Sequence, residues 1–257
     1  MTLREMDPSD PELAQPDGPD SGETSVASPE LLARRYGALD GVALLRSLIE
    51  REFPGRLAVV SSFGAESAVI LAQVAEIDRD TPVVFLDTGK LFSETLRYRD
   101  RLVALLGLRN VRTIVPDRQR LAASDPQGML WLNDPDACCA LRKVEPLERA
   151  LADFDGWVSG RKRYHGGERA ALPTFEWDDR GRIKINPLAG WPKGRMEAEF
   201  AARDLPRHPL EEQGYLSIGC LTCTDRVRPG EDPRAGRWRD LSKSECGIHD
   251  NRRRPAT

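Results

Sequence analysis

The chain has 257 residues, of which 40% are hydrophobic and 31% are charged. This composition fits one or two globular domains and excludes fibrous, collagen-like and wholly disordered proteins. No window approaches the roughly 18 consecutive apolar residues of a membrane helix, and the N-terminus lacks the basic-then-apolar layout of a secretory signal. We therefore expect a cytoplasmic protein with no membrane partner.

The net charge of −3 is unevenly distributed along the chain. Residues 1–30 hold eight acidic residues against one basic residue, so the remainder carries a charge of +4. Segment 1–28 is acidic and contains four prolines, and we predict that it is a disordered tail. The mildly basic body suits a small anionic substrate but is too weakly charged to indicate a nucleic-acid partner.

Helical and strand patterns alternate along most of the chain. Helical spacing of apolar residues predicts two amphipathic helices between Pro29 and Ile49. Short apolar runs then predict four strands, separated by three helices. The predicted strands are Leu57–Ser62, Pro82–Leu86, Val111–Val115 and Trp157–Ser159, and the predicted helices are Glu66–Ile77, Phe92–Leu106 and Ala140–Leu151.

This alternation predicts an α/β fold, with a parallel twisted sheet and helices on both faces. Ligands bind at the carboxyl ends of such strands, so the loops after Val60, Leu86 and Val158 should form the site. Beyond residue 160 we predict a hairpin of Pro173–Trp177 with Arg182–Ile185 and a helix over Arg195–Arg203. Residues 29–225 then form an α/β domain, and the Arg-, Gly- and Pro-rich residues 226–257 a mobile C-terminal segment.

Small and hydroxyl residues follow the first two predicted strands. Ser61, Ser62 and Gly64 lie in the turn before the first α/β helix, where backbone N–H groups and the helix dipole favour an anion. This turn resembles a degenerate form of the phosphate loop of adenine-nucleotide α-hydrolase-like enzymes. Thr88, in Asp87-Thr88-Gly89, is a candidate wall of the same pocket. Ordinary strand-to-helix turns remain the alternative for both segments.

Five cysteines, an odd number, argue against a secreted disulfide framework. Cys138-Cys139 and Cys220-x-x-Cys223 form two pairs that supply enough thiolates for zinc or an iron–sulfur cluster. Adjacent cysteines are unusual for zinc, whose ligands are normally spaced by two to four residues. Two inert buried cysteines beside an unrelated Cys-x-x-Cys remain the alternative.

Cys246 stands apart from the two pairs, in the sequence Glu245-Cys246-Gly247-Ile248-His249. Several basic residues precede it, and nearby cations favour the thiolate that acts as a nucleophile. Cys246 is therefore a candidate for chemistry, although a cysteine near a terminus can also be incidental.

Together these motifs resemble the assimilatory adenylyl-sulfate (APS) reductases, the thioredoxin-dependent branch of the APS/PAPS reductase family that carries an iron–sulfur cluster. The resemblance runs from about Leu57 to Asp250 and rests on the ordered combination of Cys-Cys, Cys-x-x-Cys and Glu-Cys-Gly-x-His. It implies that thioredoxin supplies electrons to reduce APS to sulfite and AMP through an S-sulfocysteine, in sulfate assimilation and cysteine biosynthesis. It leaves open whether the protein forms a homo-oligomer.

The resemblance also implies roles for individual residues. Cys246 would be the catalytic nucleophile, and a [4Fe–4S] cluster would be bound by Cys138, Cys139, Cys220 and Cys223. Lys143, Arg234, Arg237 and His249 would contact the phosphosulfate, Arg169 would approach the nucleotide, and Ser61, Ser62 and Gly64 would line the phosphate loop.

One segment departs from the family pattern. The family commonly has Thr-Gly-x-Arg-Arg-x-Gln-Ser where this chain reads Ser159-Gly160-Arg161-Lys162-Arg163-Tyr164-His165-Gly166-Gly167. The departure leaves open which of Arg161, Arg163 and His165 point into the site. Three alternatives also stay open: a reductase of PAPS or of both substrates, an ATP-dependent sulfurtransferase, and a non-enzymatic zinc-stapled binding module.

Overall fold

The computed structural model describes residues 27–239, 241 and 243–249. The predicted acidic tail, 1–28, lies outside the described residues except for its last two positions. Ser28 caps the first helix, because its hydroxyl accepts a hydrogen bond from the backbone N–H of Leu31 at 3.2 Å. No helix in the described part of the chain is both long and apolar enough to span a membrane.

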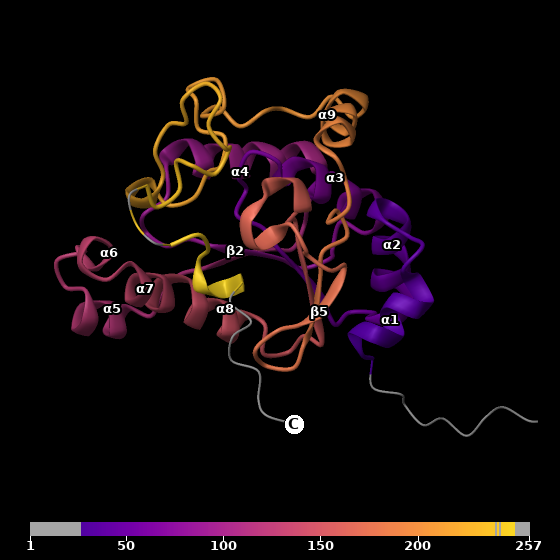
Figure 1. Ribbon diagram of the computed structural model, residues 1–257. Coiled ribbons are helices and arrows are strands. Elements are labelled where there is room, and N and C mark those ends of the chain that lie inside the picture. The colour runs from indigo at the N-terminus through magenta and orange to yellow at the C-terminus, as the bar shows by residue number, and fades with distance from the viewer. Residues whose placement is uncertain (1–26, 240, 242, 250–257) are drawn as a thin grey trace, which may run out of the picture.

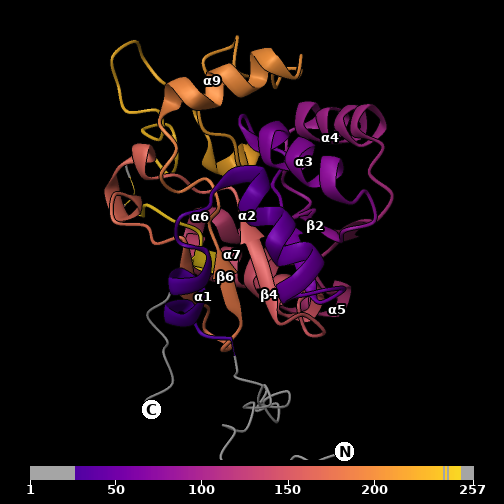
Figure 2. The ribbon, with the colours of Figure 1, turned by 90° about the vertical axis from the view of Figure 1, so that its right-hand side faces the viewer.

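A single six-stranded sheet forms the centre of the molecule (Figures 1 and 2). Its strand order is β3-β2-β1-β4-β6-β5; five strands run parallel, and β5 pairs antiparallel with β6. This arrangement confirms the predicted α/β fold, parallel sheet and hairpin. The strands are β1 (Leu57–Val60), β2 (Val83–Leu86), β3 (Val111–Ile114), β4 (Gly156–Ser159), β5 (Phe175–Trp177) and β6 (Ile183–Ile185).

Helices cover both faces of the sheet, as predicted: α3 and α4 lie on one side, and α8 lies on the other (Figure 1). Alternation along β1 explains this, because Leu57 and Val59 enter the larger apolar core while Ala58 enters a smaller core with Leu147 and Trp157. The helices are α1 (Pro29–Tyr36), α2 (Gly41–Ser47), α3 (Ser67–Ile77), α4 (Ser93–Leu106), α5 (Arg118–Ser124), α6 (Leu130–Asn133), α7 (Pro135–Cys139), α8 (Glu145–Ala150) and α9 (Lys193–Ala202).

The helical segment around the adjacent cysteines differs from the prediction. It begins at Pro135 rather than Ala140, because the Asp134 side chain caps α7 by accepting a bond from Ala137 N–H at 2.8 Å. A π-helical turn, Ala140–Val144, then joins α7 to α8. Cys138 and Cys139 therefore lie in the last turn of α7, directly before a local irregularity of a kind that is frequent at functional sites.

The strand order places a crevice beside the end of β1. The chain moves from β1 to β2 and β3 in one direction, and then crosses back to β4 on the other side of β1. The connections leaving the carboxyl ends of β1 and β4 therefore diverge, which opens space for a ligand between them.

Candidate active site

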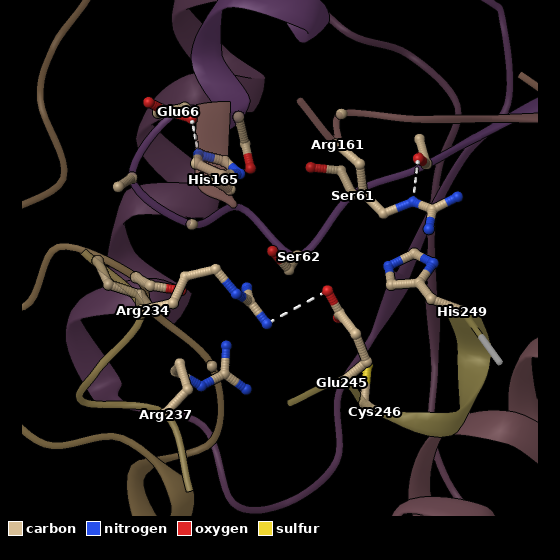
Figure 3. A pocket seen from close by; sticks show the side chains of 18 of the residues that line it. Ser61, Ser62, Glu66, Arg161, His165, Arg234, Arg237, Glu245, Cys246 and His249 are labelled. Atoms are coloured by element: carbon tan, nitrogen blue, oxygen red, sulfur yellow. Dashed lines mark hydrogen bonds and ion pairs between the residues drawn. The ribbon is translucent and has the colours of Figure 1, made fainter. Parts of the chain in front are cut away.

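A pocket lies at this crevice, where the loops after β1, β2 and β4 meet two later segments of the chain, 216–220 and 233–249 (Figure 3). Its lining confirms that the ends of these three strands meet at one site. Every residue that the sequence proposed for substrate contact, together with Cys246, lines the pocket. These residues are Ser61, Ser62, Gly64, Thr88, Lys143, Arg169, Arg234, Arg237 and His249.

The loop after β1 has a local structure suited to an anion. The Ser61 hydroxyl accepts a hydrogen bond from Phe63 N–H at 3.2 Å, and Phe63 has a φ of 50°, which bends the chain sharply. The Phe63 ring packs edge-on against Phe85, 5.3 Å between centroids, and so fixes the bend in the core. At Gly64 a Cβ atom would lie 3.3 Å from the Ser62 hydroxyl oxygen and 3.4 Å from the Ile218 carbonyl oxygen, so this glycine lies close to both walls.

Glu66, in the same loop, is a pocket residue that sequence reasoning missed. Its carboxylate accepts hydrogen bonds from Lys162 Nζ at 2.7 Å and from the Tyr164 hydroxyl, and contacts His165 Nε2 at 2.9 Å. Burial by itself would raise the pKa of Glu66, but His165 and Lys162 outweigh it and hold that pKa far below its usual range. Glu66 is therefore an anion that ties the β1 loop to the β4 loop.

The segment after β4, residues 160–167, contains the three residues whose orientation the sequence left open. Arg161 and His165 line the pocket, whereas Arg163 donates from Nε to the Leu172 carbonyl at 2.8 Å and does not line it. Arg161 is buried and paired with Glu176. His165 also lies 3.2 Å, through Nδ1, from Nη1 of Arg169.

The cations of the pocket divide into two groups. Arg161, Lys162, Arg169 and Arg234 each pair with a carboxylate: Glu176, Glu66 or Glu245. Lys143 and Arg237 line the same pocket and have no carboxylate partner among the described residues. Arg237 approaches so closely to Gly219 that any Cβ there would collide with its guanidinium group. The pocket therefore presents two positive charges that no described carboxylate neutralises.

Cys246 lines the same pocket as Lys143 and Arg237, and the residues that follow it pack against the domain. Ile248 packs against the smaller apolar core, and the His249 ring stacks on Trp157 at 6.2 Å with an interplanar angle of 15°. Burial, followed by the charge of Arg161, lowers the pKa of His249 well below its usual value, so the ring is neutral near pH 7. His249 Nδ1 is buried and has no hydrogen-bond partner among the described residues, which leaves it available to a bound ligand.

Lys143 connects Cys246 with the two cysteine pairs. Burial alone would lower the pKa of Lys143, but the charges of Cys220, Cys246 and Cys139 outweigh burial and raise it. These three thiols therefore lie near the Lys143 ammonium group. Of the four cysteines in the pairs, Cys220 lines the pocket, while Cys138, Cys139 and Cys223 lie outside its lining.

The cysteine pairs come together behind the pocket wall. Cys138, Cys139 and Cys220 are buried and Cys223 is half-buried. Thr88 Oγ1 lies 3.3 Å from Cys220 Sγ, and the charges of Cys220 and Cys223 act on the pKa of Cys138, whose rise is due mainly to burial. The two segments therefore bring their cysteines into the same region beside the pocket.

The chemistry of these thiols limits the kinds of metal site that they could form. Thiolates from Cys-rich segments are the ligands that zinc and iron–sulfur clusters use. In the described part of the chain, no group of three or more His, Cys, Asp or Glu side chains is arranged to hold a metal ion.

Sequence comparison relates the chain to proteins of known type. Residues 56–226 match the model of the phosphoadenosine phosphosulfate reductase domain. An adenosine 5′-phosphosulfate reductase from Mesorhizobium japonicum is 51% identical over 214 residues, covering 83% of this chain and 84% of the relative. A phosphoadenosine 5′-phosphosulfate reductase from Gloeobacter violaceus is 40% identical over 228 residues, covering 86% and 92%.

Comparison with solved structures finds a similar fold. A crystal structure of phosphoadenylyl-sulfate (PAPS) reductase from Candida auris, in complex with phosphate, matches with a TM-score of 0.64. The match covers 82% of this chain and all of that one, at 24% sequence identity. The similarity therefore extends across the sheet and its helices.

Proposed function

Because the chain belongs to the phosphoadenosine phosphosulfate reductase domain family, we propose that it is an adenylyl-sulfate reductase. It is an oxidoreductase acting on a sulfur group, and its substrate is adenosine 5′-phosphosulfate, the substrate named for the 51% identical relative. The products are sulfite and AMP, in sulfate assimilation and cysteine biosynthesis. We propose a cytoplasmic location, which suits this role.

One observation carries the proposal: the half-buried Cys246 shares a pocket with Lys143 and Arg237, neither of which has a carboxylate partner among the described residues. A phosphosulfate is an anion of about two charges, and these two cations match it. The hydroxyls of Ser61 and Ser62 and the β1 loop lie across the same pocket, where a 5′-phosphate would sit.

The first chemical step uses Cys246 as the nucleophile. Its thiolate attacks the sulfur atom of the substrate, a Cys246 Sγ–S bond forms, and the bond from sulfur to the bridging oxygen breaks, so that AMP leaves with the electron pair. Lys143 and Arg237 stabilise the negative charge on the transferring group, and the neutral His249 offers a hydrogen-bonding nitrogen. The enzyme then carries an S-sulfocysteine.

The second step regenerates Cys246. A thioredoxin thiolate attacks Cys246 Sγ, sulfite leaves with the electron pair of the Sγ–S bond, and a mixed disulfide forms. The second thioredoxin thiol attacks this disulfide, which releases reduced Cys246 and oxidised thioredoxin. Thioredoxin therefore supplies the two electrons. This sequence requires Cys246 to face the substrate first and a protein partner afterwards, which is why we propose that residues 226–257 are a mobile segment separate from the 29–225 domain.

The four remaining cysteines suit a [4Fe–4S] cluster, held by Cys138, Cys139, Cys220 and Cys223. When bound, the cluster supplies structural support and local charge beside the pocket. The residues of this chain connect the two regions: Thr88 contacts both the pocket and Cys220, and Lys143 follows Cys139 by four residues.

A steady-state assay tests the activity. Anaerobically purified protein should release sulfite and AMP in equal amounts from adenosine 5′-phosphosulfate and reduced thioredoxin, and Cys246→Ser should abolish this release. The 3′-phosphorylated substrate is run in parallel, because the 40% identical relative is named for it. Faster turnover of the 3′-phosphorylated substrate would overturn the preference proposed here, and sulfite release by Cys246→Ser would overturn the mechanism.

Metal analysis tests the cofactor separately. We expect about four iron ions and four acid-labile sulfides per chain, both lost in Cys220→Ser. Stoichiometric zinc without sulfide would instead identify a zinc-stapled module.

A further inference from the structure

Glu245, the residue before Cys246, lies inside the pocket and contacts two arginines, Arg169 and Arg234. Figure 3 shows the contact with Arg234. Arg169 donates to both of its carboxylate oxygens, from Nε to Oε1 and from Nη2 to Oε2 at 2.9 Å. Arg234 Nη2 lies 3.3 Å from Oε1. The side chains of Glu245 and Arg169 are each 11% exposed and that of Arg234 is 15% exposed, so the pairs are largely shielded from water.

Glu245 and Arg234 are both charged at neutral pH. Burial alone would raise the pKa of Glu245, but the hydrogen bonds and charge of Arg169, followed by the charge of Arg234, hold that pKa below its usual value. Burial and the neighbouring Arg169 lower the pKa of Arg234 to about 10, well above neutral pH. The contact is therefore an ionic bond between the C-terminal segment and the pocket wall.

The neighbours of Glu245 make this contact specific. Arg234 Nη2 also donates to the Ser244 carbonyl at 2.6 Å, and the Ser244 hydroxyl binds Glu168 at 2.9 Å. Arg169 in turn contacts His165, which contacts Glu66 of the β1 loop. A continuous chain of polar contacts thus links the loop after β1 to the residue adjoining Cys246.

We propose that Glu245 is a positioning residue: its ionic bond with Arg169 and Arg234 holds Cys246 inside the pocket, facing Lys143 and Arg237. This inference rests on the proposed function and adds to it a division of labour among the cations. Arg169 and Arg234 anchor the segment that carries the nucleophile, and Lys143 and Arg237 meet the transferring group. Arg169 is therefore not assigned to the nucleotide when the segment is docked.

Kinetics of Glu245→Gln test the role. The substitution keeps the shape and removes the charge, so we expect kcat to fall about 10- to 100-fold, as for the loss of a shielded charged hydrogen bond. The KM for adenosine 5′-phosphosulfate should stay constant or fall, because two arginines become available to an anion. A rise in KM with an unchanged kcat would overturn the proposal, since it would place Glu245 in substrate binding alone.

A matched control and a double mutant sharpen the test. Glu231→Gln removes another glutamate–arginine pair of the same C-terminal segment, with Arg239, outside the pocket lining, and should leave kcat nearly unchanged. Arg169→Gln combined with Glu245→Gln should lower kcat no further than the more damaging single substitution. Additive losses would show that the two residues act separately and would contradict the proposal.

Alkylation of Cys246 by iodoacetamide, measured by peptide mass spectrometry without substrate, tests the anchor independently of sulfite production. The alkylation rates are compared at high pH, where they no longer change with pH. A difference in the ionisation of the Cys246 thiol then does not affect the comparison. We expect Glu245→Gln to raise the limiting rate about tenfold, and an unchanged rate would refute the anchor. If the wild type releases no sulfite while Glu245→Gln still exposes Cys246, the proposed function fails and the anchor stands.

Discussion

At the scale of single residues, the pocket separates cations that are neutralised from cations that are available. Lys143 reaches the pocket from the π-helical turn after α7, and Arg237 reaches it from the C-terminal segment. Each lines the same pocket as Cys246 and has no carboxylate partner among the described residues. The charge that develops on a transferring sulfuryl group would therefore fall on these two side chains rather than on solvent.

Loss of either charge should impair catalysis more than folding. We expect Lys143→Gln and Arg237→Gln each to lower kcat/KM about 100-fold, the scale found when one preorganised donor to a transition state is removed. Steady-state sulfite release measures the effect, and Lys193→Gln, an exposed lysine of α9, is the control. If both variants retained wild-type kcat/KM, the assignment of these cations to the phosphosulfate would be wrong.

At the scale of elements, much of the framework follows from local pattern, and much of the site does not. The apolar runs of β1, β2 and β4 and the turns after them were sufficient to predict where the pocket lies. The contacts of Glu66 with Lys162 and His165 join residues 96 and 99 positions apart, and those of Glu245 with Arg169 join residues 76 apart. Such pairs depend on tertiary packing, so no local signal reveals them.

The start of α7 and the short helices α5 and α6 were not predicted, for two different reasons. The start of α7 was detectable, because Asp134 followed by Pro135 is a common beginning of a helix. The short helices α5 and α6 were not, because they have no buried residues and hence no apolar periodicity to read.

A buried ion pair joins the π-helical turn after α7 to the residue that follows α5, and the same arginine bonds the loop after β2. Arg142 Nη2 lies 2.6 Å from Asp125 Oδ2, with side chains 8% and 3% exposed, and Arg142 Nη1 donates to the Thr88 carbonyl at 2.9 Å. Asp125→Asn leaves a buried guanidinium without its counter-charge, so the free energy of unfolding should fall by about 3 kcal/mol. Urea denaturation followed by circular dichroism measures this loss. Asp80→Asn, which breaks the exposed pair with Arg109, should cause little change, and equal losses would refute the argument.

The segment between α9 and Cys220 should make stability depend on pH through Glu211. Burial raises the pKa of Glu211 to about 7, although Arg207 opposes the shift, and Glu211 Oε1 has no described partner. The folded state thus binds a proton that the unfolded state releases near pH 4.5. Stability is fully present below pH 4.5 and is lost as pH rises through about 7.

Glu211→Gln should remove that dependence. At pH 8 the variant should be more stable than the wild type by about 3 kcal/mol, and at pH 4 the two should be equal. Urea denaturation at both pH values gives the comparison, with the exposed neighbour Glu212→Gln as control. A Glu211→Gln protein that is less stable at pH 8 would show that the Glu211 carboxylate stabilises the fold.

At the scale of the whole molecule, the α/β domain and the segment that carries Cys246 make unequal contributions to stability. The sheet is complete at Ile185, and the family match ends at residue 226. Residues 243–249 add mainly contacts at the pocket: the Glu245 anchor, the packing of Ile248 and the stacking of His249 on Trp157. Cys246, the proposed nucleophile, is thus attached to a fold that is already closed by its own core.

A truncation that removes residues 243–257 tests this division. We expect the unfolding midpoint measured by calorimetry to fall by less than about 8 °C, because a loss of 1 kcal/mol shifts a domain of this size by about 2–4 °C. Sulfite release should disappear with Cys246, while AMP binding, measured by titration calorimetry, should persist because the β1 loop remains. A truncated chain that is unfolded at 25 °C would instead make the segment an integral part of the domain. In that case Cys246 could exchange between substrate and thioredoxin only by disturbing the core, and the two-position mechanism would have to be abandoned.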